Sequence, residues 1–506
     1  MEGKVYLVGA GPGDYKLMTL RGLECIQKAD VIVYDRLANE DYLKEAKAGC
    51  EIIYVGKAGS HHTLPQDEIN ALIVEKAKEG KWVTRLKGGD PYVFGRGGEE
   101  AEYLLEQGLS FETVPGITSA IGGLCYAGIP ITHRDYASSF HVITGHLRDG
   151  AEEEIPFEAL AKLRGTLVFL MGVSNLKTIT EKLLAAGKKE TTPVALVSWA
   201  TRPRQCVVVG NLKDIYEKAL EEEVKPPTLI VVGEVVHLRE KLNFFEERPL
   251  FGKTIMVTRS REQSSHLVMK LQDQGASVLE CPTITIQKNE EDTSPIWEEL
   301  DSYTYLVFTS PNGVKYFFET LHQRGKDARS LSNMQIWAVG QGTADALKMQ
   351  GIRADGIPPK AIAESLYESL KEHLKPEDRI LLPQSQIARD YLSEALKKHA
   401  HVTEIKLYTT LKPEGLSESY QAALEKGEVD YITFTSSSTC QYFVELMGQE
   451  NLDKLKDTKL ISIGPITSKT IQSYGLKVYK EAAEHTLNAL VDTIVQDSLL
   501  KSKDKE

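Results

Sequence analysis

The sequence predicts α/β domains with mostly parallel sheets. Strand-like runs alternate with amphipathic helical runs along the whole chain, as in VYLVGAG, LMTLRGLECIQKA and VIVYD near the start. This alternation is typical of parallel strands connected by covering helices. A chain of 506 residues also predicts about three or four packed units. A charged run that meets Pro249 and Gly252 marks the main boundary, between domains at 1–245 and 250–500.

Composition and charge exclude several functions. A net charge of −12 argues against a general nucleic-acid binder, and no apolar run approaches the ~20 residues that span a membrane. The chain enters a strand directly at MEGKVYLVGAG, so we expect no signal peptide. The six cysteines are widely scattered and predict no metal site and no disulfide framework, which favours a reducing, cytoplasmic location; they are Cys25, Cys50, Cys125, Cys206, Cys281 and Cys440.

The stretch 85–100, RLKGGDPYVFGRGGEE, is the clearest candidate ligand loop. It contains five glycines, an Asp-Pro step and two arginines, and it lies between a predicted strand at 82–86 and a predicted helix at 99–107. Glycine is used where the backbone turns sharply or approaches a ligand closely, and such loops at sheet edges commonly bind ligands. We therefore predict a ligand loop rather than a flexible linker.

The loop VGAGPGD at 8–14 is a weaker signal. It reads G-x-G-x-G rather than G-x-G-x-x-G, and many α/β proteins begin in this way. Asp35 lies where a dinucleotide-binding protein would place an acidic residue, but Pro12 suits a rigid turn better than close approach to a pyrophosphate. A dinucleotide-dependent oxidoreductase with a non-catalytic, two-lobed anion-binding module is therefore the alternative function.

Six motifs of the first half resemble, in the same order, those of the uroporphyrinogen-III C-methyltransferases of the tetrapyrrole (class III) methyltransferase family. They are VGAGPGD, ADVIVYDRL, VGKAG, LKGGDPYVFGRGGEE, VPGITSA and GIPITHRD, and the resemblance covers about 3–240. It implies a two-lobed αβα domain that methylates uroporphyrinogen III twice, to precorrin-2, with S-adenosylmethionine bound between the lobes. It also implies a homodimer formed through this half, and it leaves open whether the product leads to cobalamin or siroheme.

The same resemblance assigns site residues by position. Asp35 matches the residue proposed to remove a proton after methylation, with capping of the following turn as its structural alternative. Lys57 matches the proposed proton donor. The substrate carries eight carboxylates that need cations, and we expect Arg96 and Arg134 to bind them because both lie in motif loops. The positions that match cofactor contacts are Pro12, Gly88, Gly89, Asp90, Val93, Thr118, Ser119, Met171, Ala200 and Thr201.

The second half contains an internal duplication. YLVFTSPNGVKYFFETL (305–321) matches YITFTSSSTCQYFVELM (431–447), and IWAVGQGTADALKMQGIRAD (336–355) matches LISIGPITSKTIQSYGLKVY (460–479). Each unit reads strand, small polar turn, helix. Hydroxyl groups in such turns can cap the helix, and the free helix amides can hold an anion; the residues concerned are Ser310, Thr343, Ser436 and Thr467.

The duplication predicts two lobes with an anion-binding cleft between them. Lobe A would comprise 250–286 plus 410–500, and lobe B would comprise 287–409. The strands at 283–288 and 404–409 would cross between the lobes.

The pieces VTRSREQ, YLVFTSPNGV, WAVGQGTADAL, IKLYTT, YITFTSSST and ISIGPITS resemble uroporphyrinogen-III synthase over about 250–498. The resemblance implies a two-lobed α/β domain, without a cofactor, that closes linear hydroxymethylbilane into a ring and inverts the last pyrrole. Tyr408 matches the tyrosine proposed to assist loss of water, with a core tyrosine as the structural alternative. Arg389 would compensate for an arginine that this sequence lacks after Pro383. The predicted carboxylate contacts are Arg259, Ser310, Asn312, Ser436 and Thr467.

Overall fold

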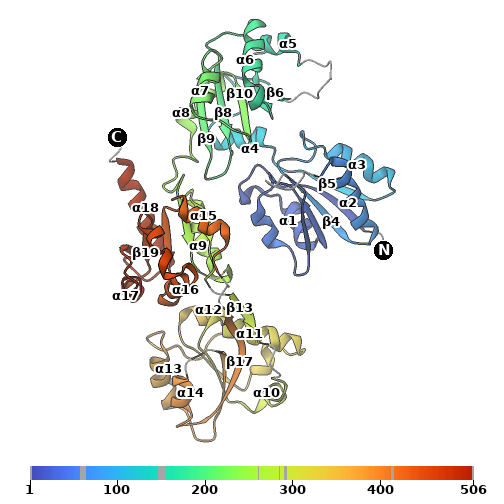
Figure 1. Ribbon diagram of the computed structural model, residues 1–506. Coiled ribbons are helices and arrows are strands. Elements are labelled where there is room, and N and C mark those ends of the chain that lie inside the picture. Colours follow the sequence, from blue (N-terminus) through green and yellow to red (C-terminus); the bar gives the residue numbers. More distant parts are fainter. Residues whose placement is uncertain are drawn as a thin grey trace. The chain divides into compact units, whose positions relative to one another are not determined.

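The computed structural model contains four five-stranded sheets with helices between the strands (Figure 1). Clustering of contacts divides the chain into two compact units. Unit 1 is Met1–Thr254 with Met269–Val278 and Ile494–Glu506, and unit 2 is Ile255–Val268 with Leu279–Thr493. The residues that the structure describes are 3–56, 64–145, 155–259, 261–283, 285–289, 293–386, 388, 390–411 and 415–503.

The first sheet is parallel and has the order β3-β2-β4-β1-β5. Its strands are β1 Lys4–Gly9, β2 Val31–Tyr34, β3 Glu51–Tyr54, β4 Trp82–Lys87 and β5 Phe111–Val114. Val5, Val31 and Val83 are fully buried in the sheet, as expected for strands covered on both faces. The helices of this region are α1 Leu20–Lys28, α2 Gln66–Lys78, α3 Gly97–Glu106 and α4 Ser119–Tyr126.

The second sheet is the exception to the mostly parallel pairing that the sequence predicts. Its order is β6-β7-β10-β8-β9, and only β6 and β7 pair in parallel, whereas the other three pairs are antiparallel. The residues at 199–205 that join β8 to β9 are too few for the long crossover that parallel strands require. The strands are β6 Phe140–Thr144, β7 Thr166–Leu170, β8 Pro193–Ser198, β9 Cys206–Asn211 and β10 Thr228–Val232; the helices are α5 Phe157–Lys162, α6 Leu176–Ala185, α7 Ile215–Glu221 and α8 Arg239–Leu242.

The third sheet combines segments that are far apart in the sequence. Its order is β12-β11-β18-β19-β20, and β11, β18, β19 and β20 pair in parallel. Phe434 and Phe443 pack edge to face in its core. The strands are β11 Thr254–Val257, β12 Ser277–Glu280, β18 Tyr431–Phe434, β19 Lys459–Ser462 and β20 Val478–Glu481; the helices are α9 Arg261–Asp273, α15 Glu418–Glu425, α16 Ser437–Met447, α17 Pro465–Ser473 and α18 Leu487–Lys503.

The fourth sheet has the order β13-β17-β16-β14-β15. The two strands expected to cross are present as β13 and β17, which pair antiparallel with Lys288 opposite Tyr408; the other pairs are parallel. The strands are β13 Thr285–Lys288, β14 Tyr305–Phe308, β15 Gln335–Ala338, β16 Arg379–Ser385 and β17 His401–Leu411; the helices are α10 Ser294–Glu298, α11 Pro311–Gln323, α12 Gln341–Met349, α13 Ala363–Leu370 and α14 Tyr391–Leu396.

Three general features bear on function. Among the described residues, no helix has the length and apolar character needed to cross a membrane. All six cysteines are free, and Cys25, Cys281 and Cys440 are buried. Within the described ranges, no group of three or more His, Cys, Asp or Glu side chains is arranged to hold a metal ion.

Candidate active sites

Four of the predicted site segments meet at the carboxyl edge of the first sheet. Asp35 follows β2, the loop 88–96 follows β4, the loop 10–14 follows β1 and the loop 115–118 follows β5. The strands β2, β4, β1 and β5 are successive neighbours in this parallel sheet, so all four segments leave it at the same edge. This edge is where open α/β sheets bind ligands.

Three glycines allow the loops at this edge to touch. Gly11 and Gly89 donate backbone hydrogen bonds to each other's carbonyl oxygens, with N···O distances of 3.1 and 2.7 Å. A β carbon added to Gly116 would lie only 2.2 Å from the carbonyl oxygen of Gly89 and 2.7 Å from Cα of Gly9. Gly89 also has a φ of +72°, which favours glycine. A larger residue at position 116 would therefore push the loops apart.

Asp90 braces two of these loops. Its Oδ1 accepts a hydrogen bond from the backbone N–H of Tyr92 at 2.8 Å, and its Oδ2 accepts one from the N–H of Gly116 at 3.0 Å. Gly88 packs against Leu37, because a β carbon at position 88 would lie 2.6 Å from Cβ of Leu37. Val93 is half-buried in the same loop. The predicted cofactor loop is thus tied to the segments that follow β2 and β5.

The start of α4 brings three more predicted residues to this edge. Thr118 caps the helix, and its Oγ1 accepts a hydrogen bond from the N–H of Ala120 at 3.4 Å. Ser119 is the first helical residue. Pro12 lies against the helix, since a β carbon at Gly122 would lie 2.9 Å from Cγ of Pro12. All three predicted residues are half-buried.

Loops of the second sheet supply the remaining predicted cofactor residues. Met171 follows β7 and is exposed, whereas Ala200 and Thr201 follow β8 and are buried. Thr201 reaches the loop after β1, because its Oγ1 accepts a hydrogen bond from the N–H of Asp14 at 3.0 Å. The hydroxyl of Tyr126 donates to Oδ2 of the same Asp14 at 2.9 Å. Asp14 therefore connects the first loop to both α4 and the loop after β8.

Unfavourable backbone angles concentrate in these loops. Six described residues other than glycine have a positive φ, and Glu223 is the only one of these outside the loops. Such conformations cost about 1–3 kcal/mol each and persist mainly at functional sites. Three of the other five are predicted site residues, namely Arg96, Met171 and Thr201. Phe94 and Trp199 were not predicted, because neither Phe nor Trp is a residue type that favours a positive φ.

Asp35 is held by a buried arginine that the sequence analysis did not select. Its Oδ2 lies 3.2 Å from a terminal guanidinium nitrogen of Arg85, and its Oδ1 accepts a hydrogen bond from the N–H of Leu37 at 3.1 Å. Asp35 therefore also caps the turn that follows it. Arg85 also contacts Glu100, which pairs with Lys87. The run WVTRLK places Arg85 and Lys87 among apolar positions of a buried strand, which is the signal that could have found these two residues.

The cations predicted to bind substrate carboxylates lie at the surface. Arg96 pairs with Glu99 at 2.5 Å, and both side chains are about half exposed. Arg134 is exposed in a turn. The structure shows no interaction between these two arginines. Lys57 lies outside the described residues.

Arg204 interacts with two other arginines, Arg36 and Arg202, and Arg202 and Arg204 were not selected from the sequence. Arg36 follows Asp35 directly, and the guanidinium of Arg204 lies 3.3 Å from the ring centre of Trp199. Burial, together with the positive charges of Arg202 and Arg36, lowers the pKa of Arg204. Arg202 itself packs against the first loop, because a β carbon at Gly13 would lie 2.9 Å from Nε of Arg202.

In unit 2, two predicted residues from distant segments meet. Oγ of Ser310 and Oη of Tyr408 lie 2.8 Å apart. Ser310 caps α11, and its Oγ accepts a hydrogen bond from the N–H of Gly313 at 3.0 Å. The ring of Tyr408 stacks on Tyr316 with a centroid distance of 5.5 Å. Tyr408 is only 6% exposed, and this burial raises its pKa.

The hydroxyl residues of the duplicated units occupy two kinds of position. Ser436 caps α16 and forms a capping box with Thr439, which matches the place of Ser310. Thr343 and Thr467 are buried within the first turns of α12 and α17. The expectation that all four lie in the turns is therefore wrong for these two threonines, because Gly340 and Gly464 occupy the capping positions.

Arg259, Ser436 and Thr467 share one edge of the third sheet. They follow β11, β18 and β19, which are neighbours in that sheet. Burial lowers the pKa of Arg259. Asn312 instead follows β14 of the fourth sheet, as the half-buried second residue of α11. Arg389 lies outside the described residues.

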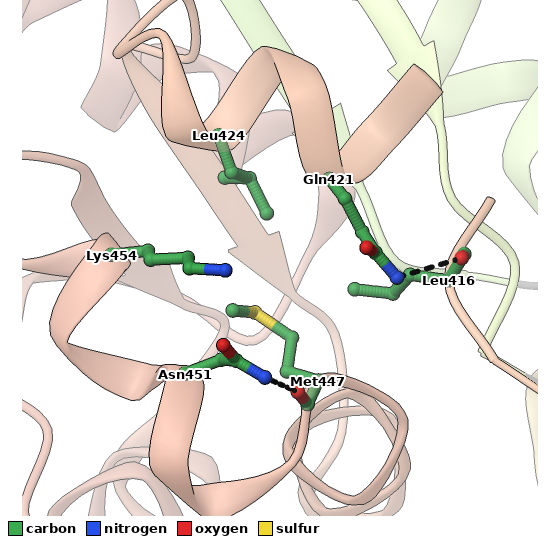
Figure 2. Close-up of a pocket in the computed structure, with 6 residues that line it drawn as sticks. All are labelled: Leu416, Gln421, Leu424, Met447, Asn451 and Lys454. Carbon is green, nitrogen blue, oxygen red and sulfur yellow. Dashed lines mark hydrogen bonds between the residues drawn. The ribbon is translucent and has the colours of Figure 1, made fainter. Parts of the chain in front are cut away.

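The predicted site residues are not among those that line two cavities of unit 2. One of about 20 Å³ has room for about one water, and its amide side chains bond to the backbone: Gln421 to the oxygen of Leu416 and Asn451 to that of Met447 (Figure 2). The other has about 430 Å³ and three cations in its lining; its residues are Lys288, Asn289, Thr293, Thr320, Gln323, Arg324, Lys406 and Leu407.

Comparison with known proteins gives matches to two protein families. The family described as Tetrapyrrole (Corrin/Porphyrin) Methylases matches residues 4–216, and the family described as Uroporphyrinogen-III synthase HemD matches residues 265–492. The porphyrin biosynthesis protein HemD of Ruminiclostridium josui is 42% identical over 98% of this chain and 98% of its own. The chain belongs to the tetrapyrrole methylase and uroporphyrinogen-III synthase families, fused in that order.

Further relatives match the methylase half most strongly. The uroporphyrinogen-III C-methyltransferase of Bacillus subtilis (strain 168) is 43% identical over 71% of this chain and 74% of its own. The structure of a Thermus thermophilus uroporphyrin-III C-methyl transferase complexed with S-adenyl homocysteine is 41% identical, with a TM-score of 0.41, and covers 47% of this chain and 100% of that chain.

The family resemblances predicted from the sequence are therefore confirmed for both halves. The chain is a bifunctional enzyme of tetrapyrrole biosynthesis. These matches give no support to the alternative of a dinucleotide-dependent oxidoreductase with an anion-binding module.

Proposed function

We propose that the chain catalyses two consecutive steps of tetrapyrrole synthesis. The synthase half, 250–500, closes hydroxymethylbilane to uroporphyrinogen III, and the methylase half, 1–245, methylates this product twice to precorrin-2. The observation that carries the proposal is the match of both families within one chain, together with a relative that is similar over nearly the whole length. Fusion raises the effective concentration of a labile intermediate near the second site.

The loops at the edge of the first sheet fit the methyl donor. S-adenosylmethionine supplies a methyl group on a positively charged sulfur. Gly88 and Gly89 are half-buried and have no side chain to separate their backbone from a ligand, and Asp90 braces the loop that carries them. Exposed Met171 and the first turn of α4, with Thr118 and Ser119, supply apolar and polar contacts. The remaining proposed contacts are Pro12, Val93, Ala200 and Thr201.

The methylase half mainly positions its substrate and accepts a proton. An electron-rich pyrrole carbon is already a nucleophile, so correct placement supplies much of the rate enhancement. Asp35 is held in place by a hydrogen bond from Arg85, and its carboxylate can take the proton that the methylated carbon loses. Lys57 is proposed as the proton donor. Arg96 and Arg134 are proposed to bind carboxylates, joined by the cluster at Arg36, Arg202 and Arg204.

The synthase half works through its protein groups alone in this proposal. Tyr408 keeps its proton because burial raises its pKa, so its hydroxyl can donate to the departing hydroxyl group of hydroxymethylbilane. Ser310 orients that hydroxyl. The helix starts near Ser310, Asn312, Ser436 and Thr467 present amides that favour carboxylates, and Arg259 adds a positive charge. The proposed lobes are 250–286 plus 410–500 for lobe A and 287–409 for lobe B.

The full chain is also proposed to be cytoplasmic and to dimerise through its methylase half. The family resemblance supports the dimer, and six free cysteines fit a reducing compartment. Sedimentation of the intact chain and of the half 1–245 tests the dimer. If both the intact chain and the half 1–245 sediment as monomers, the proposed dimer is wrong.

One assay tests both activities. The full chain is incubated with hydroxymethylbilane, with and without S-adenosylmethionine, and the products are resolved by mass and isomer type. We expect uroporphyrinogen III without the methyl donor and a doubly methylated product with it. Formation of the type I isomer alone would refute the synthase activity, and an unmethylated product in both samples would refute the methyltransferase activity.

A further inference from the structure

Glu100 lies at the centre of a buried ion network beside the loop 88–96. Its side chain is 1% exposed. Its Oε1 accepts from Nζ of Lys87 at 2.6 Å, from Nε2 of Gln66 at 3.0 Å and from Nε of Arg85 at 3.3 Å. Its Oε2 is buried and has no hydrogen-bond partner among the described residues. One carboxylate oxygen thus anchors donors from both β4 and α2.

The two cations of this network depend on the carboxylate. The side chains of Arg85 and Lys87 are only 4% and 5% exposed, and buried charges are costly unless they are paired. Burial and the charge of Arg85 lower the pKa of Lys87, and Glu100 opposes that shift. Glu100 lies in the first turn of α3, where the helix dipole favours a negative charge.

Arg85 links this network to Asp35. Its Nε contacts Glu100, one terminal nitrogen donates to the carbonyl oxygens of Leu86 at 3.1 Å and Val33 at 3.4 Å, and the other donates to Oδ2 of Asp35 at 3.2 Å. The planar guanidinium is therefore fixed on three sides. The direction in which it presents an N–H to Asp35 depends on its anchor at Glu100.

We propose that Glu100 is a positioning residue for methyl transfer, which fixes Arg85 and, through it, the carboxylate of Asp35. This inference rests on the proposed methyltransferase function. Glu100 also belongs to the helix that begins directly after the proposed cofactor loop. It therefore ties the segment that binds the methyl donor to the group that accepts the proton.

The charges around Asp35 set the direction of the expected effect. Among the described residues, Arg85 and Lys87 interact with Asp35 from β4, Arg36 adjoins it, and Arg96 interacts with Glu100. Loss of the Glu100 charge leaves these cations with less compensation, so that they stabilise ionised Asp35 more strongly. An Asp35 carboxylate that is stabilised more strongly is a weaker base.

The test compares Glu100→Gln with wild type in the full chain. Glutamine keeps the shape and the accepting oxygen but loses the charge. We expect the maximal methylation rate to fall about tenfold, the acid limb of the pH profile to move to lower pH, and the dissociation constant for S-adenosylmethionine to stay unchanged. Glu102→Gln, at an exposed position of the same helix, is the matched control and should behave as wild type. Asp35→Asn should abolish the acid limb of the pH profile.

Each outcome decides for or against the inference. A lower rate with an unmoved acid limb would give Glu100 a purely structural role, and an unchanged rate would also overturn the inference. If wild type does not methylate at all, the proposed function fails instead. Should Glu100→Gln not fold, Arg85→Lys probes the same link, because lysine cannot bind both carboxylates in one plane. It should move the limb to higher pH, and an unmoved limb would overturn the inference.

Discussion

The hydroxyl oxygens of Ser310 and Tyr408 lie 2.8 Å apart although 98 positions separate the two residues in the sequence. Ser310 caps α11, which follows β14, and Tyr408 lies on β17, which is two strands from β14 in the sheet. A single hydrogen bond therefore connects the start of the helix to that strand. The phenol is thereby held near a helix N-terminus, where negative charge is favoured. The arrangement suits a group that must give up a proton.

Tyr408→Phe separates the chemical role of this tyrosine from its packing role. Phenylalanine retains the ring that stacks on Tyr316 but lacks the hydroxyl. We expect the free energy of unfolding of the synthase half to fall by about 1 kcal/mol, while formation of the type III isomer slows by at least about tenfold. Denaturant unfolding and isomer analysis measure the two effects. An unchanged rate would show that Tyr408 is only a core residue.

The two serine caps offer a matched comparison of stability. Ser436→Ala removes a helix cap, which should cost about 1 kcal/mol. Ser310→Ala removes the equivalent cap and also leaves the buried hydroxyl of Tyr408 without this partner, which should add about 1–2 kcal/mol. Denaturant unfolding of the two variants tests the difference. Equal losses would mean that the bond to Tyr408 contributes nothing to stability.

Alkaline pH should weaken the synthase half partly through Tyr408. Burial raises the pKa of this residue above that of an unfolded tyrosine, which is about 10. Between the unfolded and the folded pKa of this tyrosine, the folded chain binds more protons than the unfolded chain. The stabilisation is therefore complete below the pKa of an unfolded tyrosine and is lost as pH rises through the pKa of Tyr408 in the folded chain. As pH is raised through this range, Tyr408→Phe should therefore lose less stability than wild type, as measured by denaturant unfolding. A parallel loss in both proteins would contradict the assignment.

The contact between loops at the first sheet should tolerate no side chain at Gly116. In Gly116→Ala the new methyl group would lie 2.2 Å from the carbonyl oxygen of Gly89, so the loops must separate. We expect at least about tenfold weaker S-adenosylmethionine binding in a calorimetric titration. Gly98→Ala is the control, because a β carbon added at position 98 would have nothing within 4 Å and alanine favours the helix. Equal binding by both variants would refute a role for this contact.

Asp35→Ala should stop methylation and leave ring closure intact. Asp35 contacts Arg85 and Leu37 within unit 1, whereas the proposed synthase residues lie in unit 2. Loss of the carboxylate removes the proton acceptor, which should slow methylation by about 10²–10⁴-fold. The combined assay with hydroxymethylbilane and S-adenosylmethionine should then yield uroporphyrinogen III. Loss of both activities would contradict independent sites.

Much of the fold could be predicted because the local signals agree with it. Alternating strand and helix patterns predicted the α/β class, and the repeated strand–turn–helix units predicted the matching places of Ser310 and Ser436. The second sheet differs because antiparallel pairing depends on connection length and on partners that are distant in the sequence, which hydrophobic pattern does not report.

The candidate sites were predictable where a residue type has one strong use. The glycines at 88 and 89 signalled close backbone contact, and the structure provides it. Glu100 was missed because its partners on β4 and α2 are 13 to 34 positions away in the sequence, so it reads as an ordinary surface charge until the fold pairs it with them. Phe94 and Trp199 were missed because strain at these positions arises from surrounding packing.

The pairing of β13 with β17 places Lys288 opposite Tyr408. Side chains alternate between the two faces of a strand, so a shift by one position would turn every side chain of that strand to the other face. A single-residue insertion in β17 before Tyr408 would carry the phenol away from Ser310 without changing any residue of the site. Selection on this enzyme should therefore act on the length of this strand as strictly as on the identity of its tyrosine.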